Sequence, residues 1–308
     1  MTQAPIDKAS ARRSFDRAAN GYDAAAFLQR EIGGRLLERL DYCRLTPKTI
    51  LDLGCGTGQA IGALMRRYPK ARVIALDFAF GMLRLARRRG TWFNRPRVLC
   101  ADAEALPLAD GCVDLIVSNA ALQWCNDLDR TFNDLLRILR PGGLLMFTSF
   151  GPDTLRELRA AWAVADGLPA GPAQTYVQPQ THVSPFVDMH DLGDALVRAR
   201  FAEPVMDAEH LTLTYVGLRD LMRDLKGIGA HNAASDRPRG LTGPRRLAAL
   251  EAAYETQRRE GRLPATYEVV YGHAWAPELA ARGRHTDAGF AIPVGAIGRH
   301  RPPGGGGL

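Results

Sequence analysis

A regular alternation of apolar segments and helical segments runs from residue 49 to residue 149 and constrains the fold more than any other feature. The apolar segments have the length of strands: Thr49–Leu53, Arg72–Leu76, Arg97–Cys100, Val113–Asn119 and Leu144–Ser149. Val113–Asn119 is mostly apolar, as a strand buried on both faces should be. Amphipathic segments of helical length lie between them: Gln59–Tyr68, Phe80–Arg89 and Asp129–Leu139. Strands connected in this way pair in parallel through right-handed crossovers. We therefore predict an α/β fold with a doubly wound, mostly parallel sheet and a ligand beyond the carboxyl ends of its strands.

The flanking segments add helices and two more strands. Residues 10–40 have helical periodicity, and Leu211–Val216 and Thr266–Trp275 read as strands that complete a seven-stranded sheet. Further helices are expected after residue 150: Pro152–Asp166, Asp188–Arg200, Leu218–Lys226 and Arg245–Glu260. We divide the chain into an N-terminal helical lid (1–45), a ligand-binding core (46–150), a sheet-completing part with a second helical lid (151–285) and a disordered tail (286–308).

Composition excludes several classes of protein. No apolar run is long enough to span a bilayer, and the first twenty residues lack the apolar core of a secretory signal, so we expect a cytoplasmic protein without a membrane segment. The five cysteines form no CxxC pair, and we expect no disulfide framework and no metal. The net charge of +7 is compatible with an acidic partner.

The loop after the first strand is rich in glycine and carries an acid at its start. Gly54 and Gly56 allow a sharp turn and a close approach of ligand to backbone around Cys55. The dinucleotide fingerprint G-x-G-x-x-G fails because residue 59 is Gln, and no Gly-Lys-Ser/Thr of a P-loop follows. Asp52 would repel a pyrophosphate but could bind the ammonium group of a methionine moiety. The loop therefore favours S-adenosylmethionine over a nucleotide phosphate.

Acids at the ends of the next two strands agree with this choice. Asp77 can accept hydrogen bonds from both ribose hydroxyls, although it could also be a turn residue. Asp102 can accept from the adenine amine, with Ala103 supplying a backbone N–H, although it could also cap a helix. Phe78 and Met82 are placed to pack on the adenine faces. In this order and at successive strand ends, these residues predict an S-adenosylmethionine site.

The motifs resemble those of known families. The segment 50–58, Asp77, Asp102 and the segment 136–143 are similar to class I S-adenosylmethionine-dependent methyltransferases, with their Rossmann-like fold. Other stretches resemble the malonyl-acyl-carrier-protein O-methyltransferases of biotin synthesis: 15–23 with 28–30, 118–124, 150–158, 225–230 and 265–271. The loop near 167–180 and the tail after Pro277 have no clear counterpart in that family, which leaves the shape of the lid mouth open.

The resemblance implies methyl transfer to the free carboxylate of a malonyl thioester held by acyl-carrier protein. Such a carboxylate is already ionised at neutral pH, so no general base is expected. The resemblance places Asn119 on the cofactor side. It assigns acceptor positioning to Tyr22, Gln123, Trp124 and Lys226. Tyr22 could instead only pack between helices, and Lys226 could be a solvated helix end.

The lid between 223 and 262 has more basic than acidic residues, and Arg245 and Arg246 lie near a helix start, where cations are disfavoured. We expect these two arginines to dock an acidic carrier protein. Another class I methyltransferase, with a carboxylate, quinone or sterol acceptor, is the main alternative. A nucleic-acid-binding role is disfavoured because no RNA module or base-methylation motif is present. Whether the malonyl group is carried by protein or by coenzyme A stays open.

Overall fold

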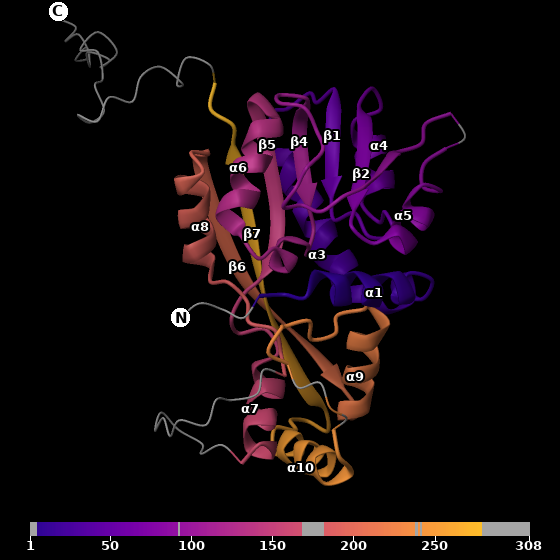
Figure 1. Ribbon diagram of the computed structural model, residues 1–308, viewed down its shortest axis with the longest axis vertical. Helices are drawn as coiled ribbons and strands as arrows, with labels where there is room; N and C mark the ends of the chain where they lie inside the picture. Colours follow the sequence, from indigo (N-terminus) through magenta and orange to yellow (C-terminus); the bar gives the residue numbers. More distant parts are fainter. Residues whose placement is uncertain (1–4, 92, 168–181, 238–239, 241, 279–308) are drawn as a thin grey trace, which may run out of the picture.

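The computed structural model describes residues 5–91, 93–167, 182–237, 240 and 242–278, and its centre is one seven-stranded sheet (Figure 1). The strand order is β3-β2-β1-β4-β5-β7-β6. The strands are β1 Thr49–Leu53, β2 Arg72–Asp77, β3 Arg97–Cys100, β4 Val113–Ser118, β5 Leu139–Phe150, β6 Ala202–Tyr215 and β7 Leu263–Trp275. The first five pair in parallel, whereas β7 runs antiparallel to β5 and β6. The predicted α/β class and mostly parallel sheet are confirmed.

Helices cover both faces of the sheet, as a doubly wound fold requires. The described helices are α1 Lys8–Ala18, α2 Tyr22–Ala25, α3 Phe27–Glu38, α4 Ile61–Arg67, α5 Phe80–Ala86, α6 Leu128–Ile138, α7 Arg156–Ala165, α8 Met189–Arg198, α9 Leu218–Gly227 and α10 Pro244–Glu255, with short 3-10 turns at Arg39–Tyr42 and Leu122–Trp124.

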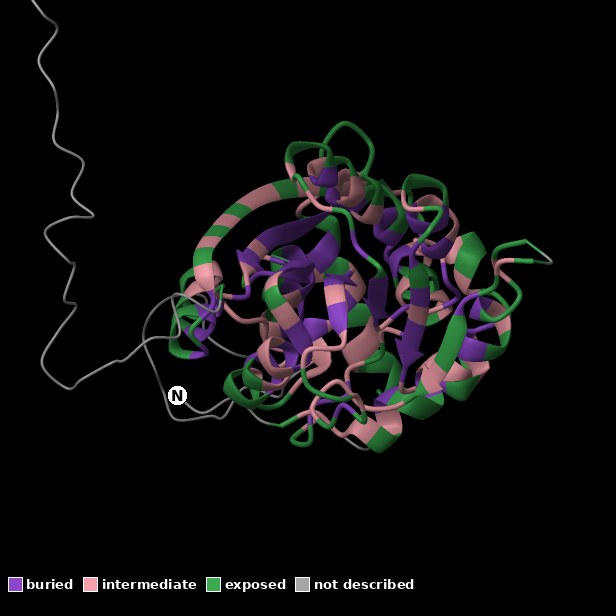
Figure 2. Ribbon diagram, turned by 90° about the horizontal axis from the view of Figure 1, so that it is seen from above, coloured by how far each residue is buried: buried purple, intermediate pink, exposed green. Residues whose placement is uncertain are grey.

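Strand β1 shows why the core has two halves. All five of its residues are buried, and successive side chains point to opposite faces. Ile50 joins a cluster with α3 and α4, whereas Leu51 and Leu53 join a second cluster with α6 and α8. Figure 2 shows the buried residues concentrated in the strands, with exposed residues outside. The short apolar segment that predicted this strand is therefore explained, because both of its faces are covered by helices.

The largest differences from the predicted strand bounds are in β5 and β6; β7 also begins three residues early, and β2 and β4 each end one residue from the predicted end. β6 was expected over Leu211–Val216 but begins at Ala202. Its residues alternate between half-buried and exposed, because it is an edge strand that pairs only with β7. Polar residues on the exposed face hide such a strand from an apolar search. β5 begins at Leu139, ahead of Pro141, and a register shift opposite Val113 and Leu115 accommodates this start.

The N-terminal segment, defined here as residues 5–25, lies across the carboxyl ends of the parallel strands (Figure 1). Helix α3, which was assigned to the predicted lid, instead contributes Leu28, Ile32 and Leu36 to the core. Beyond this segment β6 and β7 continue and carry α7, α9 and α10. The predicted tail (286–308) and residues 168–180 of the loop lie outside the described residues. In the described part of the chain, no helix combines the length and apolar character needed to cross a membrane.

Candidate functional site

A first cavity opens at the carboxyl ends of β1, β2 and β4, under the N-terminal segment. Most residues that the sequence predicted for the cofactor line it: Gly54, Gly56, Asp77, Phe78, Met82, Asp102, Ala103 and Asn119. Asp52 and Cys55 do not appear on its wall. The order of motifs along the chain is thus converted by the fold into one enclosed surface.

The glycine loop adopts a backbone that other residues would strain. Gly54 and Gly56 have φ values of +69° and +53°. A Cβ on Gly54 would lie 2.3 Å from the Cβ of Ala121, whereas a Cβ on Gly56 would meet nothing closer than Tyr22 Cε1 at 4.0 Å. Gly54 is therefore required by packing, and the absent side chain of Gly56 leaves open space for a ligand against the backbone.

Asp52 is buried behind the loop with an unusual charge state. It is 2 % exposed, and its Oδ2 has no hydrogen-bond partner among the described residues. Burial, together with the nearby Asp77, raises the pKa of Asp52 to about 7. An unpartnered buried carboxylate oxygen is a position that a cation would stabilise.

Cys55 has a different environment from the rest of the loop. Its side chain belongs to the core cluster, and its N–H donates to the carbonyl of Leu76 over 2.9 Å. Burial raises the pKa of its thiol well above the ordinary value, so the thiol stays protonated. Only the backbone of Cys55 remains available for ligand contact.

Asp77 stabilises the loop as well as lining the cavity. Its Oδ2 accepts from the N–H of Gly56 at 2.9 Å, and its Oδ1 accepts from the N–H of Ala79 at 2.8 Å. Burial raises the pKa of Asp77 to about 6, although the N–H donors at Ala79 and Gly56 act in the opposite direction.

Asp102 has a partner that the sequence reasoning missed. Its Oδ1 accepts from Lys8 Nζ at 2.6 Å and from the N–H of Glu104 at 3.0 Å. The second contact is the cap-like bond considered as the alternative reading. Lys8 lines the first cavity together with Phe15 and Tyr22 of the N-terminal segment. Its contact spans 94 positions of sequence, so no local pattern could reveal it.

The N-terminal segment is fastened to the glycine loop by Asp23. Its Oδ1 accepts from Thr57 Oγ1 at 2.5 Å and from Gln59 Nε2 at 2.9 Å. Its Oδ2 pairs with Arg89 Nη2 at 2.5 Å. Tyr22, the neighbour of Asp23, is thereby held over the cavity.

A second cavity adjoins the first and shares Phe15, Tyr22, Ala120 and Trp124 with it. Phe15 packs edge-on against Trp124, with ring centroids 5.1 Å apart. Burial raises the pKa of Tyr22, so its hydroxyl remains a neutral donor. The junction between the cavities is thus largely aromatic.

Two predicted acceptor residues have contrasting positions. Gln123 lines the second cavity; its Nε2 donates to the carbonyl of Ala120 at 2.6 Å, and its Oε1 is buried without a partner among the described residues. Lys226 is exposed on α9 and does not line the cavity, although Leu225 and Ile228 do. A direct contact of Lys226 with an acceptor inside this cavity is therefore not supported.

Arg246 and His182 form a cluster at another part of the second cavity. His182 lies parallel to the Trp162 ring at 3.8 Å, and its Nε2 is 2.9 Å from Asp166 Oδ2. Arg246 Nε donates to Asp166 Oδ1 at 2.8 Å. Arg246 thus anchors α10 to α7, while Arg245 is exposed. The sequence reasoning grouped two arginines with different environments.

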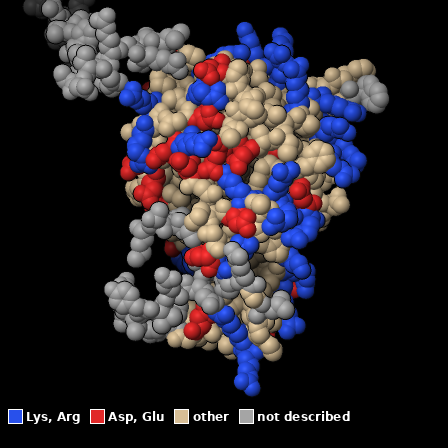
Figure 3. Space-filling view, in the orientation of Figure 1, with Lys and Arg blue, Asp and Glu red and all other residues tan. Residues whose placement is uncertain are grey.

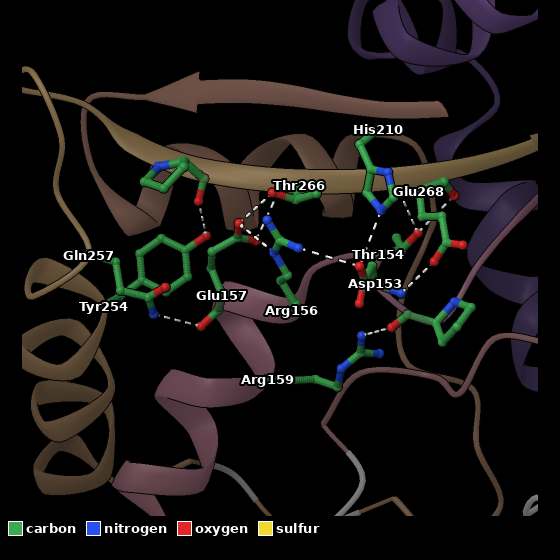
Figure 4. A network of polar contacts seen from close by, with 12 residues as sticks. Asp153, Thr154, Arg156, Glu157, Arg159, His210, Tyr254, Gln257, Thr266 and Glu268 are labelled. Atoms are coloured by element: carbon green, nitrogen blue, oxygen red, sulfur yellow. Dashed lines mark hydrogen bonds and ion pairs between the residues drawn. The ribbon is translucent and has the colours of Figure 1, made fainter. Parts of the chain in front are cut away.

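A polar network connects the start of α7 to β7 beside the second cavity (Figure 4). The N–H of Asp153 donates to Glu268 Oε2 at 2.8 Å, and the N–H of Thr266 donates to Glu157 Oε2 at 2.9 Å.

Asp153, His210 and Glu268 have ligand atoms within 4.8 Å of one another. Their mutual and backbone hydrogen bonds account for this grouping without an ion. The network positions Thr154 on the cavity wall.

The fold and the first cavity define a methyltransferase of the class with a seven-stranded sheet, and comparison with known proteins agrees. The family model described as "Methyltransferase domain" matches residues 51–147. The structure resembles the YcgJ protein of Bacillus subtilis (TM-score 0.54, 14% identity, covering 80% of this chain and 98% of that one). It also resembles a protein of Bacillus halodurans that is described as "a putative methyltransferase" (TM-score 0.53, 16% identity, covering 78% of this chain and 98% of that one). These two likenesses show the fold alone.

Closer relatives identify the family. The malonyl-[acyl-carrier protein] O-methyltransferase of Methylovorus sp. is 55% identical over 281 residues, which cover 89% of this chain and 90% of the relative. The protein of the same name from Gallionella capsiferriformans is 51% identical, with 90% and 93% covered. The chain belongs to the malonyl-[acyl-carrier protein] O-methyltransferase family and is an enzyme.

Proposed function

We propose that this enzyme transfers the methyl group of S-adenosylmethionine to the free carboxylate of malonyl-acyl-carrier protein and so initiates pimeloyl and biotin synthesis in the cytoplasm. The proposal rests mainly on one observation: two adjoining cavities meet at Tyr22, Ala120 and Trp124. One is lined by the glycine loop, behind which the unpartnered acid Asp52 is buried, and the other has a largely apolar wall. A donor and an acceptor bound in the two would meet at this junction.

The residues of the first cavity fit S-adenosylmethionine. The open space at Gly56 is suited to close contact with the loop backbone, and the orphaned Oδ2 of Asp52, although buried behind the loop and not on the wall, is suited to the ammonium group. Asp77 is proposed to bind the ribose hydroxyls, Phe78 and Met82 to pack on adenine. We further propose that Asp102 accepts a hydrogen bond from the adenine amine, that the backbone N–H of Ala103 donates to the adenine ring, and that Asn119 closes this side of the cavity. No metal is invoked.

When bound, S-adenosylmethionine supplies an electrophilic methyl group: a carboxylate oxygen forms the new C–O bond as the S–C bond breaks and sulfur keeps the electron pair. The chain need not move a proton, because the acceptor is already an anion. Its own contribution is alignment and exclusion of water. Phe15, Tyr22 and Trp124 exclude water at the junction, and the Asp23 contacts hold Tyr22 in place.

Carrier docking is proposed on the positive side of the molecule. Figure 3 shows Lys and Arg side chains gathered along the side that carries α5, α1 and α9. Arg245 remains a docking candidate because it is exposed, whereas Arg246 is better suited to holding α10. Lys226 is exposed on α9 and can attract an acidic carrier from there.

The proposal is tested by turnover with labelled S-adenosylmethionine and three acceptors: malonyl-carrier protein, malonyl-coenzyme A and acetyl-carrier protein. Label should pass to both malonyl thioesters and not to the acetyl thioester, which lacks the carboxylate. Equal labelling of the acetyl thioester, or none of any malonyl thioester, would refute it.

A further inference from the structure

The wall of the second cavity contains no Lys, Arg, Asp or Glu among its described lining residues. Its polar side chains are amides, hydroxyls, an indole and the imidazoles of His182 and His231. An anionic acceptor carboxylate must therefore be recognised there by neutral hydrogen-bond donors. Such donors suit this reaction, since a direct ion pair with a cation would reduce the nucleophilicity of the carboxylate oxygen.

Most of these donors are already occupied. His182 is held by Asp166 and stacked on Trp162. The amide nitrogen of Gln123 donates to the carbonyl of Ala120. The hydroxyl of Thr154 donates to the backbone of Glu268. By contrast, four lining residues have a side-chain donor without a hydrogen-bond partner within the part of the chain that the structure describes: His231, Tyr22, Gln29 and Trp124. Of these, Tyr22 is close to the carboxylates of Asp23 and Asp77, whereas His231 is close to Arg17 and Lys226.

His231 lies on the part of the wall that contacts α1. The backbone N–H of His231 donates to the carbonyl of Gly229 at 2.8 Å. Gly229 packs so closely on α1 that a Cβ there would be 3.2 Å from Phe15 Cδ1 and from Ala18 Cβ. Phe15 lines both cavities, so the turn that carries His231 packs against a residue of their junction.

The charges around His231 favour an anion without forming a direct ion pair. His231 is itself an exposed residue, and the partial desolvation of its ring, together with Arg17 and Lys226, lowers its pKa, which keeps the imidazole neutral at physiological pH. Arg17 and Lys226 are both exposed and outside the wall of the cavity. They create a positive potential at its edge, while the neutral ring still offers one N–H.

We propose that His231 is the specificity-determining residue that recognises the acceptor carboxylate in the second cavity. Its ring N–H donates to one carboxylate oxygen and leaves the other directed to the junction, where Tyr22 completes the pocket. The role assigned from sequence to Lys226 is thus divided: His231 makes the contact, and Lys226 with Arg17 attracts the anion from outside. This inference rests on the proposed function, because it names the residue that selects a carboxylate acceptor.

The test compares binding of malonyl-pantetheine and its methyl ester, which differ in charge at the relevant oxygen, to protein saturated with S-adenosylhomocysteine. His231→Ala should weaken malonyl-pantetheine binding about tenfold to a hundredfold, the range for one hydrogen bond to a charged group. Binding of the methyl ester should be unchanged. His231→Gln should recover part of the loss because it restores an N–H donor. His190→Ala is the matched control, since the His190 side chain is 83% exposed on α8.

The outcomes separate the inference from the function on which it rests. Equal losses for both ligands would show that His231 only shapes the cavity, and unchanged malonyl binding would show that it makes no contact; either result overturns the inference while wild-type turnover preserves the proposed function. A wild type that neither binds malonyl-pantetheine nor methylates it would refute both. If His231→Ala does not fold, judged by its affinity for S-adenosylhomocysteine, the comparison is made with His231→Gln against a Phe substitution at the same position, which keeps the ring and removes the donor.

Discussion

Replacing Asp52 by Asn should change stability and donor binding in opposite directions. In the free protein the carboxyl group is buried, and its pKa rises from 3.8 to about 7. A group whose folded-state pKa is raised favours folding in its protonated form, so this contribution is complete below the unfolded pKa and is lost as pH rises through the folded pKa. Ionised Asp52 therefore destabilises the free enzyme at alkaline pH.

The size of the effect follows from the shift. A rise in the pKa of Asp52 from 3.8 to about 7 lowers the free energy of unfolding by up to about 4 kcal/mol above pH 8. About 2 kcal/mol of this loss develops between pH 5.5 and 8.5. Asn cannot ionise, so the free energy of unfolding of Asp52→Asn, relative to that of the wild type, should increase by about 2 kcal/mol between pH 5.5 and 8.5. A constant cost of about 1–3 kcal/mol for an unsatisfied buried amide does not alter this difference. Donor affinity should fall about tenfold to a hundredfold, because the ammonium group loses its anionic partner.

Urea unfolding of both proteins at pH 5.5 and 8.5, without ligand, measures the first quantity, and calorimetry with S-adenosylmethionine at pH 8.5 measures the second. Parallel pH dependence of unfolding in the two proteins would contradict the proposed charge state. Undiminished donor affinity in the variant would contradict the assignment of Asp52 to the ammonium group.

Further substitutions test other parts of the site. Gly56→Val should abolish donor binding measured by calorimetry, because the branched side chain would fill the space below Tyr22 and strain a backbone with φ +53°; retained affinity would place the donor elsewhere. Asp23→Asn should weaken donor binding several-fold and speed amide exchange in residues 5–25, since it removes the ion pair to Arg89; unchanged exchange would argue against a role of Asp23 in holding the N-terminal segment to the glycine loop. Arg245→Glu should raise KM for malonyl-carrier protein and spare malonyl-coenzyme A, whereas Arg246→Glu should lower the thermal midpoint; the reverse pattern would exchange their roles. With saturating donor, the transfer rate should stay nearly flat from about pH 6 to 9, because the acceptor is ionised throughout; a steep rise would indicate a general base.

The sequence predicted the parallel sheet because its signals are local. β1 is buried throughout, is mostly apolar and runs directly into the glycine loop, so period, length and turn chemistry agree within ten residues. The same locality explains why Asp77 and Asp102 were found: each follows a recognisable strand, and parallel strands end at one edge.

What could not be predicted depends on contacts between distant segments. Arg246 was grouped with Arg245, yet its partner Asp166 is 80 residues away. Lys8 reaches Asp102 across 94 positions. Lys226 was assigned to acceptor positioning, but the orientation of α9 turns Leu225 to the cavity and leaves Lys226 exposed. Side-chain orientation on a lid helix is set by the surfaces it packs against, which no local pattern encodes.

The central claim is tested most directly by locating the transferred methyl group. Malonyl-carrier protein is incubated with the enzyme and S-adenosylmethionine carrying a deuterated methyl group, and the phosphopantetheine arm is then released and analysed by fragmentation mass spectrometry. The account predicts one labelled methyl group on the terminal carboxylate, removed as deuterated methanol by mild base. Label on carbon, sulfur or a protein side chain, or label that survives base, would contradict it.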